Sequence, residues 1–133
     1  MYKATGTVHY DTSDGHWVTV WVSQDLADYY YSLIPKYARV VRPRWKAHIT
    51  VLRPEENPTN LELWGKHQGE QVTFVYDPFI GYEAGFWWFN LWCVELETIR
   101  LEHGLSIKSR ITVPPPGYSK AFHCTVAKDS LIA

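Results

Sequence analysis

The sequence predicts one α+β domain that is built mostly from antiparallel strands and has two pseudo-symmetric halves. Its 133 residues suit a single domain with one core. Hydrophobic residues make up 46% and charged residues 20%, as in an ordinary globular protein, and 16% aromatic content is too high for a disordered chain. The order strand–helix–strand occurs twice. We therefore expect two lobes over residues 1–133, with mostly antiparallel sheets around a central cleft and helices outside.

The first half begins with two runs of β-branched and aromatic residues, separated by a turn that is rich in Asp and Gly. Ser23 then suits the N-cap of a helix, and Pro35 cannot continue that helix. Pro43 breaks the chain again before the last run of the half. The expected elements are strand 3–10, strand 16–22, helix 24–34, a short strand near 39–41 and strand 46–52.

The second half repeats this order after a loop that contains two prolines. Thr59 suits the cap of a short helix, and Gly104 suits the end of a longer one. Residues 77–85 and 113–117 are expected to be loops because they carry Pro and Gly, and the segment 106–111 is ambiguous. The expected elements are helix 59–66, strand 71–76, a buried strand 86–94, helix 95–103 and strand 121–127.

Charge and cysteine content narrow the function. Thirteen Lys and Arg against fourteen Asp and Glu give a net charge of −1, so the basic surplus typical of proteins that wrap long nucleic acid is missing. Cys93 and Cys124 both lie in apolar runs, which indicates two buried, reduced thiols of a cytosolic protein. The sequence also lacks the apolar stretches of a membrane span or a signal peptide. Neither a metal nor another cofactor is expected, because no residues have metal-ligand spacing.

The closing strand of each half carries the same short motif, an apolar residue followed by His, an apolar residue, Thr and Val. Chance predicts roughly half a His-x-Thr in a chain of this composition. Two copies at matching places in the two halves are therefore unlikely to be accidental. The copies are Ala47-His48-Ile49-Thr50-Val51 and Phe122-His123-Cys124-Thr125-Val126.

The strand period gives the motif its chemical meaning, because residues i and i+2 point to the same face of a strand. If the two halves pack with approximate two-fold symmetry, His48, Thr50, His123 and Thr125 meet across one cleft. One imidazole can then remove a proton from an attacking hydroxyl while the other protonates the leaving oxygen. The Thr hydroxyls can donate to the phosphate oxygens as charge builds up. The four residues are the predicted catalytic set.

Paired His-x-Thr motifs on the strands of a duplicated α+β chain resemble the 2H phosphoesterase superfamily, whose active site works without metal. The compact size and the opening Gly6-Thr7-Val8-His9-Tyr10-Asp11 are most similar to the phage anti-CBASS nucleases, which cleave cyclic di- and trinucleotide second messengers. The resemblance implies that an aromatic near the N-terminus, here Tyr10, contacts a base. It also implies a second aromatic contact after the first His motif, for which Trp87 and Trp88 lie in the right stretch with Tyr82 and Phe86.

Three further residues are candidate substrate contacts. Lys46 lies two residues before His48 and so shares its face, where a cation would attract phosphate. Tyr118 and Lys120 lie in the loop after three prolines, and a loop that is already rigid loses little entropy on binding.

The resemblance implies an enzyme of the bacterial host cytoplasm that cleaves 3′–5′ bonds of cyclic nucleotides and so counters CBASS defence. We expect a monomer or weak homodimer that binds neither long nucleic acid nor a membrane. Two alternatives stay open: an RNA-end 2′,3′-cyclic phosphodiesterase of the same superfamily, and a non-catalytic module that sequesters nucleotides. The sequence does not say which His is the acid.

Overall fold

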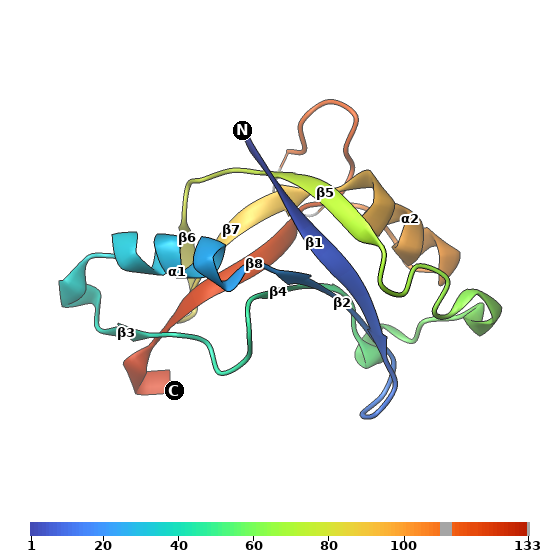
Figure 1. Ribbon diagram of the computed structural model, residues 1–133, viewed down its shortest axis with the longest axis horizontal. Helices are drawn as coiled ribbons and strands as arrows, with labels where there is room; N and C mark the ends of the chain where they lie inside the picture. Colours follow the sequence, from blue (N-terminus) through green and yellow to red (C-terminus); the bar gives the residue numbers. More distant parts are fainter. Residues whose placement is uncertain (110–112, 133) are drawn as a thin grey trace.

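Eight strands and two short α-helices form the regular structure of the computed structural model, which describes residues 1–109 and 113–132 (Figure 1). Of the ambiguous segment 106–111, residues 110 and 111 lie outside the described part. The strands are β1 (Tyr2–Asp11), β2 (Trp17–Val22), β3 (Val40–Val41), β4 (His48–Leu52), β5 (Gln71–Tyr76), β6 (Gly81–Glu83), β7 (Phe86–Trp92) and β8 (Phe122–Asp129). The helices are α1 (Gln24–Leu33) and α2 (Val94–Glu102).

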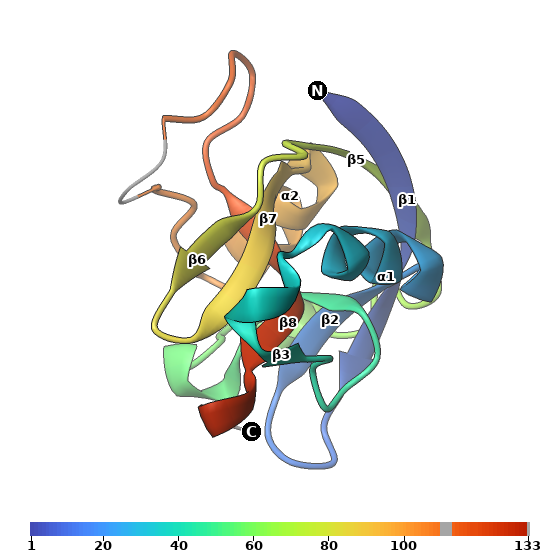
Figure 2. The same ribbon diagram turned by 90° about the vertical axis from the view of Figure 1, so that its left-hand side faces the viewer.

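Six of these strands close into an antiparallel barrel. The order of neighbours is β8-β4-β2-β1-β5-β7, and β7 pairs with β8 to complete the ring. The short strands β3 and β6 are attached to the ring, β3 beside β8 and β6 outside β7 (Figure 2). The barrel removes most free strand edges from the sheet.

The predicted two-lobe α+β fold is therefore wrong, and the chain is mostly β. The expected order of elements is largely present, but β1 pairs with β5 and β4 pairs with β8, so both halves join one sheet. The helices have only 10 and 9 residues and lie toward opposite ends of the long axis (Figure 1). Neither has the length or the apolar run needed to cross a membrane.

Alternation along the strands separates the inside of the barrel from the outside. Val8 in β1, Val18 and Val20 in β2, and Ile49 in β4 are fully buried, whereas the residues between them on the same strands face outward. Cys93 and Cys124 are both buried, as predicted. One hydrophobic cluster thus fills the barrel, and the polar positions of the strands form its outer surface.

The structure changes several predicted elements. The loop predicted over 77–85 contains β6, which forms a hairpin with β7. Ala84 and Gly85 both have positive φ, 52° and 86°, as a two-residue type I′ turn requires. The short helix predicted over 59–66 is a single 3₁₀ turn, Leu61–Leu63, and β8 runs two residues beyond the predicted strand.

Candidate active site

The two His-x-Thr motifs lie next to each other on the outer face of the barrel. Strands β4 and β8 are antiparallel neighbours in which Ile49 pairs with Cys124. Both residues of that pair are buried, so the flanking residues of each strand point outward. This register places His48 opposite Thr125, and Thr50 opposite His123. The two imidazoles are diagonal neighbours, a relation that in antiparallel pairs separates residues by about 7–8 Å.

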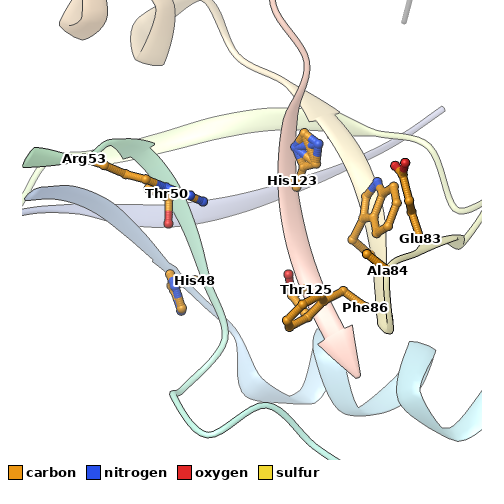
Figure 3. A pocket seen from close by; sticks show the side chains of 9 residues that line it. His48, Thr50, Arg53, Glu83, Ala84, Phe86, His123 and Thr125 are labelled. Atoms are coloured by element: carbon orange, nitrogen blue, oxygen red, sulfur yellow. The ribbon is translucent and has the colours of Figure 1, made fainter. Parts of the chain in front are cut away.

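All four residues line one open pocket with a volume of about 400 Å³, which we call the site pocket. In Figure 3, His48 and Thr50 lie on one strand and His123 and Thr125 on the next, and Arg53 reaches from the end of β4 toward the pocket. Glu83 lies beyond β8 as seen from His48, and the ring of Phe86 reaches from β7 across β8 to the side of Thr125. The lining residues are His48, Thr50, Arg53, Glu83, Ala84, Phe86, Trp88, His123 and Thr125.

A backbone contact fixes the orientation of His48. Its Nδ1 lies 2.7 Å from the carbonyl oxygen of Lys46. A carbonyl only accepts hydrogen bonds, so Nδ1 carries the proton and donates it. The other ring nitrogen, Nε2, is left to exchange a proton with a ligand in the site pocket.

His123 has a different environment. Its ring contacts the indole of Trp88, with the ring centroids 5.8 Å apart. The residue is exposed on the outer face of the barrel, but partial desolvation by its neighbours, and then the positive charges of Lys120 and Arg53, lower the pKa of His123 below its usual value of 6.5. His123 is therefore mostly neutral at pH 7, as a proton acceptor must be.

Cations and anions are distributed unevenly around the two histidines. Arg53 lines both the site pocket and a second pocket on the Thr50 and His123 side, where Lys120 also lies. The Lys120 ammonium group is 5.7 Å from the centre of the Phe122 ring. Arg53 thus brings positive charge to a phosphate between the histidines, while Glu83 adds a carboxylate to the same pocket. Lys120 shares the second pocket with Glu55 and Glu56.

Helix α2 holds both motif strands through two buried charged residues one turn apart. Arg100 donates to the carbonyl oxygen of Val51 at 2.7 Å and forms hydrogen bonds of 2.9 and 3.1 Å with Glu56. Glu97 accepts hydrogen bonds from the backbone N–H groups of Ser119 at 2.9 Å and Lys120 at 3.3 Å. The end of β4 and the segment entering β8 are thus anchored to the same helix.

The predicted substrate contacts are not all brought to the site. Trp88 lines the site pocket, and Lys120 lies in the pocket next to it. Lys46 lies instead in a groove on the other side of His48. Trp87 packs partly against the core and donates a hydrogen bond to Asp129, and Tyr118 lines neither the site pocket nor its two neighbours.

Tyr10 cannot serve as the predicted base contact. Its side chain is only 9% exposed, inside the barrel, and its ring packs edge-on against Trp64 at 5.0 Å. His9, its neighbour on the strand, is the residue that faces outward. The sequence contained the signal: His9 shares its face with the polar Thr7 and Asp11, whereas Tyr10 follows the apolar alternation through Val8.

The structure also adds residues that the sequence argument did not select. Arg53 lines the site pocket and follows Thr50 by only three residues. Glu83 reaches the site pocket through the unpredicted strand β6. The β6–β7 hairpin places it beside β7, but only the long-range pairing of β7 with β8 brings it to the pocket, and no local signal in the sequence predicts that pairing.

Among residues 1–109 and 113–132, no three His, Cys, Asp or Glu side chains are grouped so that they could hold a metal ion.

Comparisons with protein-family models, with curated proteins and with solved structures find no match for this chain.

Proposed function

We propose that this chain is a metal-independent phosphodiesterase that cleaves 3′–5′ bonds of cyclic di- or trinucleotides by acid–base catalysis with His48 and His123. The observation that carries the proposal is that both His-x-Thr motifs line one pocket. Two histidines in diagonal positions can act on opposite sides of a phosphorus atom. The resemblance of the motifs to 2H phosphoesterases supports the same chemistry, although the barrel differs from the two-lobe fold that it implied.

In the proposed mechanism, the ribose 2′-hydroxyl attacks the adjacent phosphorus. One histidine takes the hydroxyl proton as the O2′–P bond forms, and the other gives a proton to the 5′-oxygen as the P–O5′ bond breaks. The product carries a 2′,3′-cyclic phosphate and a free 5′-hydroxyl. Thr50 and Thr125 can donate hydrogen bonds to the non-bridging oxygens, and Arg53 can balance their growing charge.

We assign the role of base to His123 and the role of acid to His48. The lowered pKa of His123 supports this assignment because a base must be unprotonated before the reaction. His48 then takes the role of acid, and the hydrogen bond from its Nδ1 to the Lys46 carbonyl holds the ring so that Nε2 is the nitrogen that gives the proton to the leaving oxygen.

A small ligand suits this site better than a long nucleic acid. The chain has a net charge of −1, and positive charge near the site comes from individual residues such as Arg53 and Lys120. Long nucleic acids depend on many such contacts. In a phage-infected bacterium, an enzyme of this type would remove the nucleotides that signal infection.

The test is to incubate the protein with cyclic di- and trinucleotides, linear RNAs and RNA 2′,3′-cyclic ends in excess EDTA, and to separate the products by chromatography. We expect cleavage of cyclic nucleotides, and a loss of about 10²–10⁴-fold in kcat for His48→Ala and for His123→Ala. His67→Ala is the matched control, because His67 pairs with Glu70 and Glu102 outside the site.

Turnover that requires added Mg²⁺ or Zn²⁺ would refute the metal-free mechanism. Cleavage confined to RNA ends would refute the cyclic nucleotide as substrate, but not acid–base catalysis by the two histidines. Tight nucleotide binding without any turnover would identify a sequestering module instead of an enzyme.

A further inference from the structure

A groove lined by aromatic residues lies beside the site pocket on the other side of His48. Its volume is about 640 Å³, and Trp21, Trp45 and His48 are among the residues that line it. His48 also lines the site pocket, so the groove and the site pocket adjoin at this residue. Trp21 and Trp45 are 56% and 69% exposed, which is unusual for such large apolar side chains.

The strand register places a tryptophan on each side of the motif residues. Trp21 of β2 pairs with His48 of β4, and Trp88 of β7 pairs with Thr125 of β8. Because His48 lies opposite Thr125, these four residues form one row across four adjacent strands. At about 4.8 Å per strand, the backbones at the two tryptophans are about 14 Å apart, with the proposed reaction centre midway between them.

The groove carries more negative charge than the site pocket, where Arg53 is matched by the single carboxylate Glu83. Asp11 and Asp14 lie at the end of the groove near the β1–β2 turn, and Lys46 is the cation that lines it. Hydrogen bonds from the backbone N–H and hydroxyl of Ser13 lower the pKa of Asp11, which is thus ionised at neutral pH. Carboxylates repel a phosphate but accept hydrogen bonds from the N–H groups of a nucleobase.

Resting on the proposed function, we propose that this groove is a second base site, in which Trp21 and Trp45 stack on one base of a cyclic dinucleotide and Asp11 accepts hydrogen bonds from the edge of that base. The site pocket, with Trp88, takes the other base. Guanine is the preferred occupant of the groove because its N1–H and N2–H₂ donors are adjacent and match a carboxylate. His9 also lines the groove and packs against Trp21, with the ring centroids 4.5 Å apart.

The experiment measures binding instead of turnover, so that it is independent of the catalytic proposal. The probes are the cyclic dinucleotides of 2′-deoxyguanosine and 2′-deoxyadenosine, which lack the proposed nucleophile, and titration calorimetry gives the Kd. Trp21→Ala and Trp45→Ala should each weaken binding by about 5- to 150-fold, the range for loss of one stacked base. Asp11→Asn should raise the Kd of the guanine probe by about tenfold and leave the Kd of the adenine probe unchanged.

Tyr37→Ala is the matched control, because Tyr37 is an aromatic side chain that is 86% exposed and lines neither the groove nor the site pocket. Thermal unfolding shows whether each variant is folded. If Trp21→Ala and Trp45→Ala bind both probes like Tyr37→Ala, the second base site is wrong. His48→Ala still tests the proposed function separately, because that variant must lose turnover of the ribose substrate whatever the groove does.

Discussion

Replacing Arg100 by Met tests whether the charged residues of α2 hold the motif strands. The Arg100 side chain is 7% exposed and donates to Val51, Glu56 and Ser106. Breaking a buried ion pair by removing one partner costs about 3–5 kcal/mol. Because the Glu56 side chain is 36% exposed, we expect the lower end, about 3 kcal/mol, in the free energy of unfolding.

A loss of this size raises the fraction of unfolded protein by about 150-fold. With a urea dependence of about 2 kcal/mol per molar, the unfolding midpoint should fall by about 1.5 M. The matched control is Lys66→Met, because Lys66 is 54% exposed and its pair with Glu102 should contribute about 1 kcal/mol or less. The double variant with Glu56→Gln should cost less than the sum of the two single changes.

The pH dependence gives a second measurement on the same pair. Burial opposes ionisation of Glu56, but the hydrogen bonds from Arg100 and from the Arg53 backbone prevail and lower its pKa below 4.5. A carboxyl whose pKa is lower in the folded state stabilises the protein above its unfolded pKa, and loses this effect as the pH falls through the folded value. The difference in unfolding free energy between wild type and Arg100→Met should therefore be largest at pH 7 and become smaller below about pH 4.5. A midpoint for Arg100→Met equal to that of Lys66→Met at pH 7 would refute the anchoring role.

Three further predictions concern the chemistry. Thr50→Ala and Thr125→Ala should each lower kcat by about 10²–10³-fold in steady-state kinetics, with little change in the urea midpoint of unfolding. An unchanged kcat would show that the hydroxyls take no part in the mechanism. In a pH–rate profile of kcat/KM, the acid limb should lie below pH 6.5 because the pKa of His123 is lowered. Lys120→Gln removes one charge that lowers this pKa and should move the limb to higher pH, and a shift to lower pH would contradict the assignment of His123 as base. A cyclic dinucleotide with 2′-deoxyribose should bind and resist cleavage, and comparable hydrolysis would indicate direct attack by water.

The sequence predicted the local elements well because each depends on neighbouring residues. Alternation located β2, Ser23 and Pro35 bracketed α1, and the two motifs were placed on strands. The strand period also correctly placed His48 and Thr50 on one face, and His123 and Thr125 on one face. These statements need only residues within a few positions of each other.

The fold class failed because it depends on which strands pair. The repeated strand–helix–strand order fits two lobes as well as one ring, and the choice is made by the pairing of β1 with β5 and of β4 with β8. The partner residues in these pairs are about 70 positions apart, for example Gly6 with Val72 and Ile49 with Cys124. No local pattern encodes such a contact. The position of Glu83 at the site pocket and the pairing of Trp21 with His48 also depend on which strands are neighbours, so the sequence did not predict them.

Closure of the barrel determines when the two histidines take up their relative positions. Strand β4 is hydrogen-bonded to β2 on one side and to β8 on the other, and β8 is in turn hydrogen-bonded to β7. Neither motif strand can slide or tilt without breaking ladders on both of its sides. The distance between the imidazoles is therefore set when the chain folds, before any ligand arrives, and the backbone amides of Ile49 and Cys124 should exchange their hydrogens only when the whole ring opens.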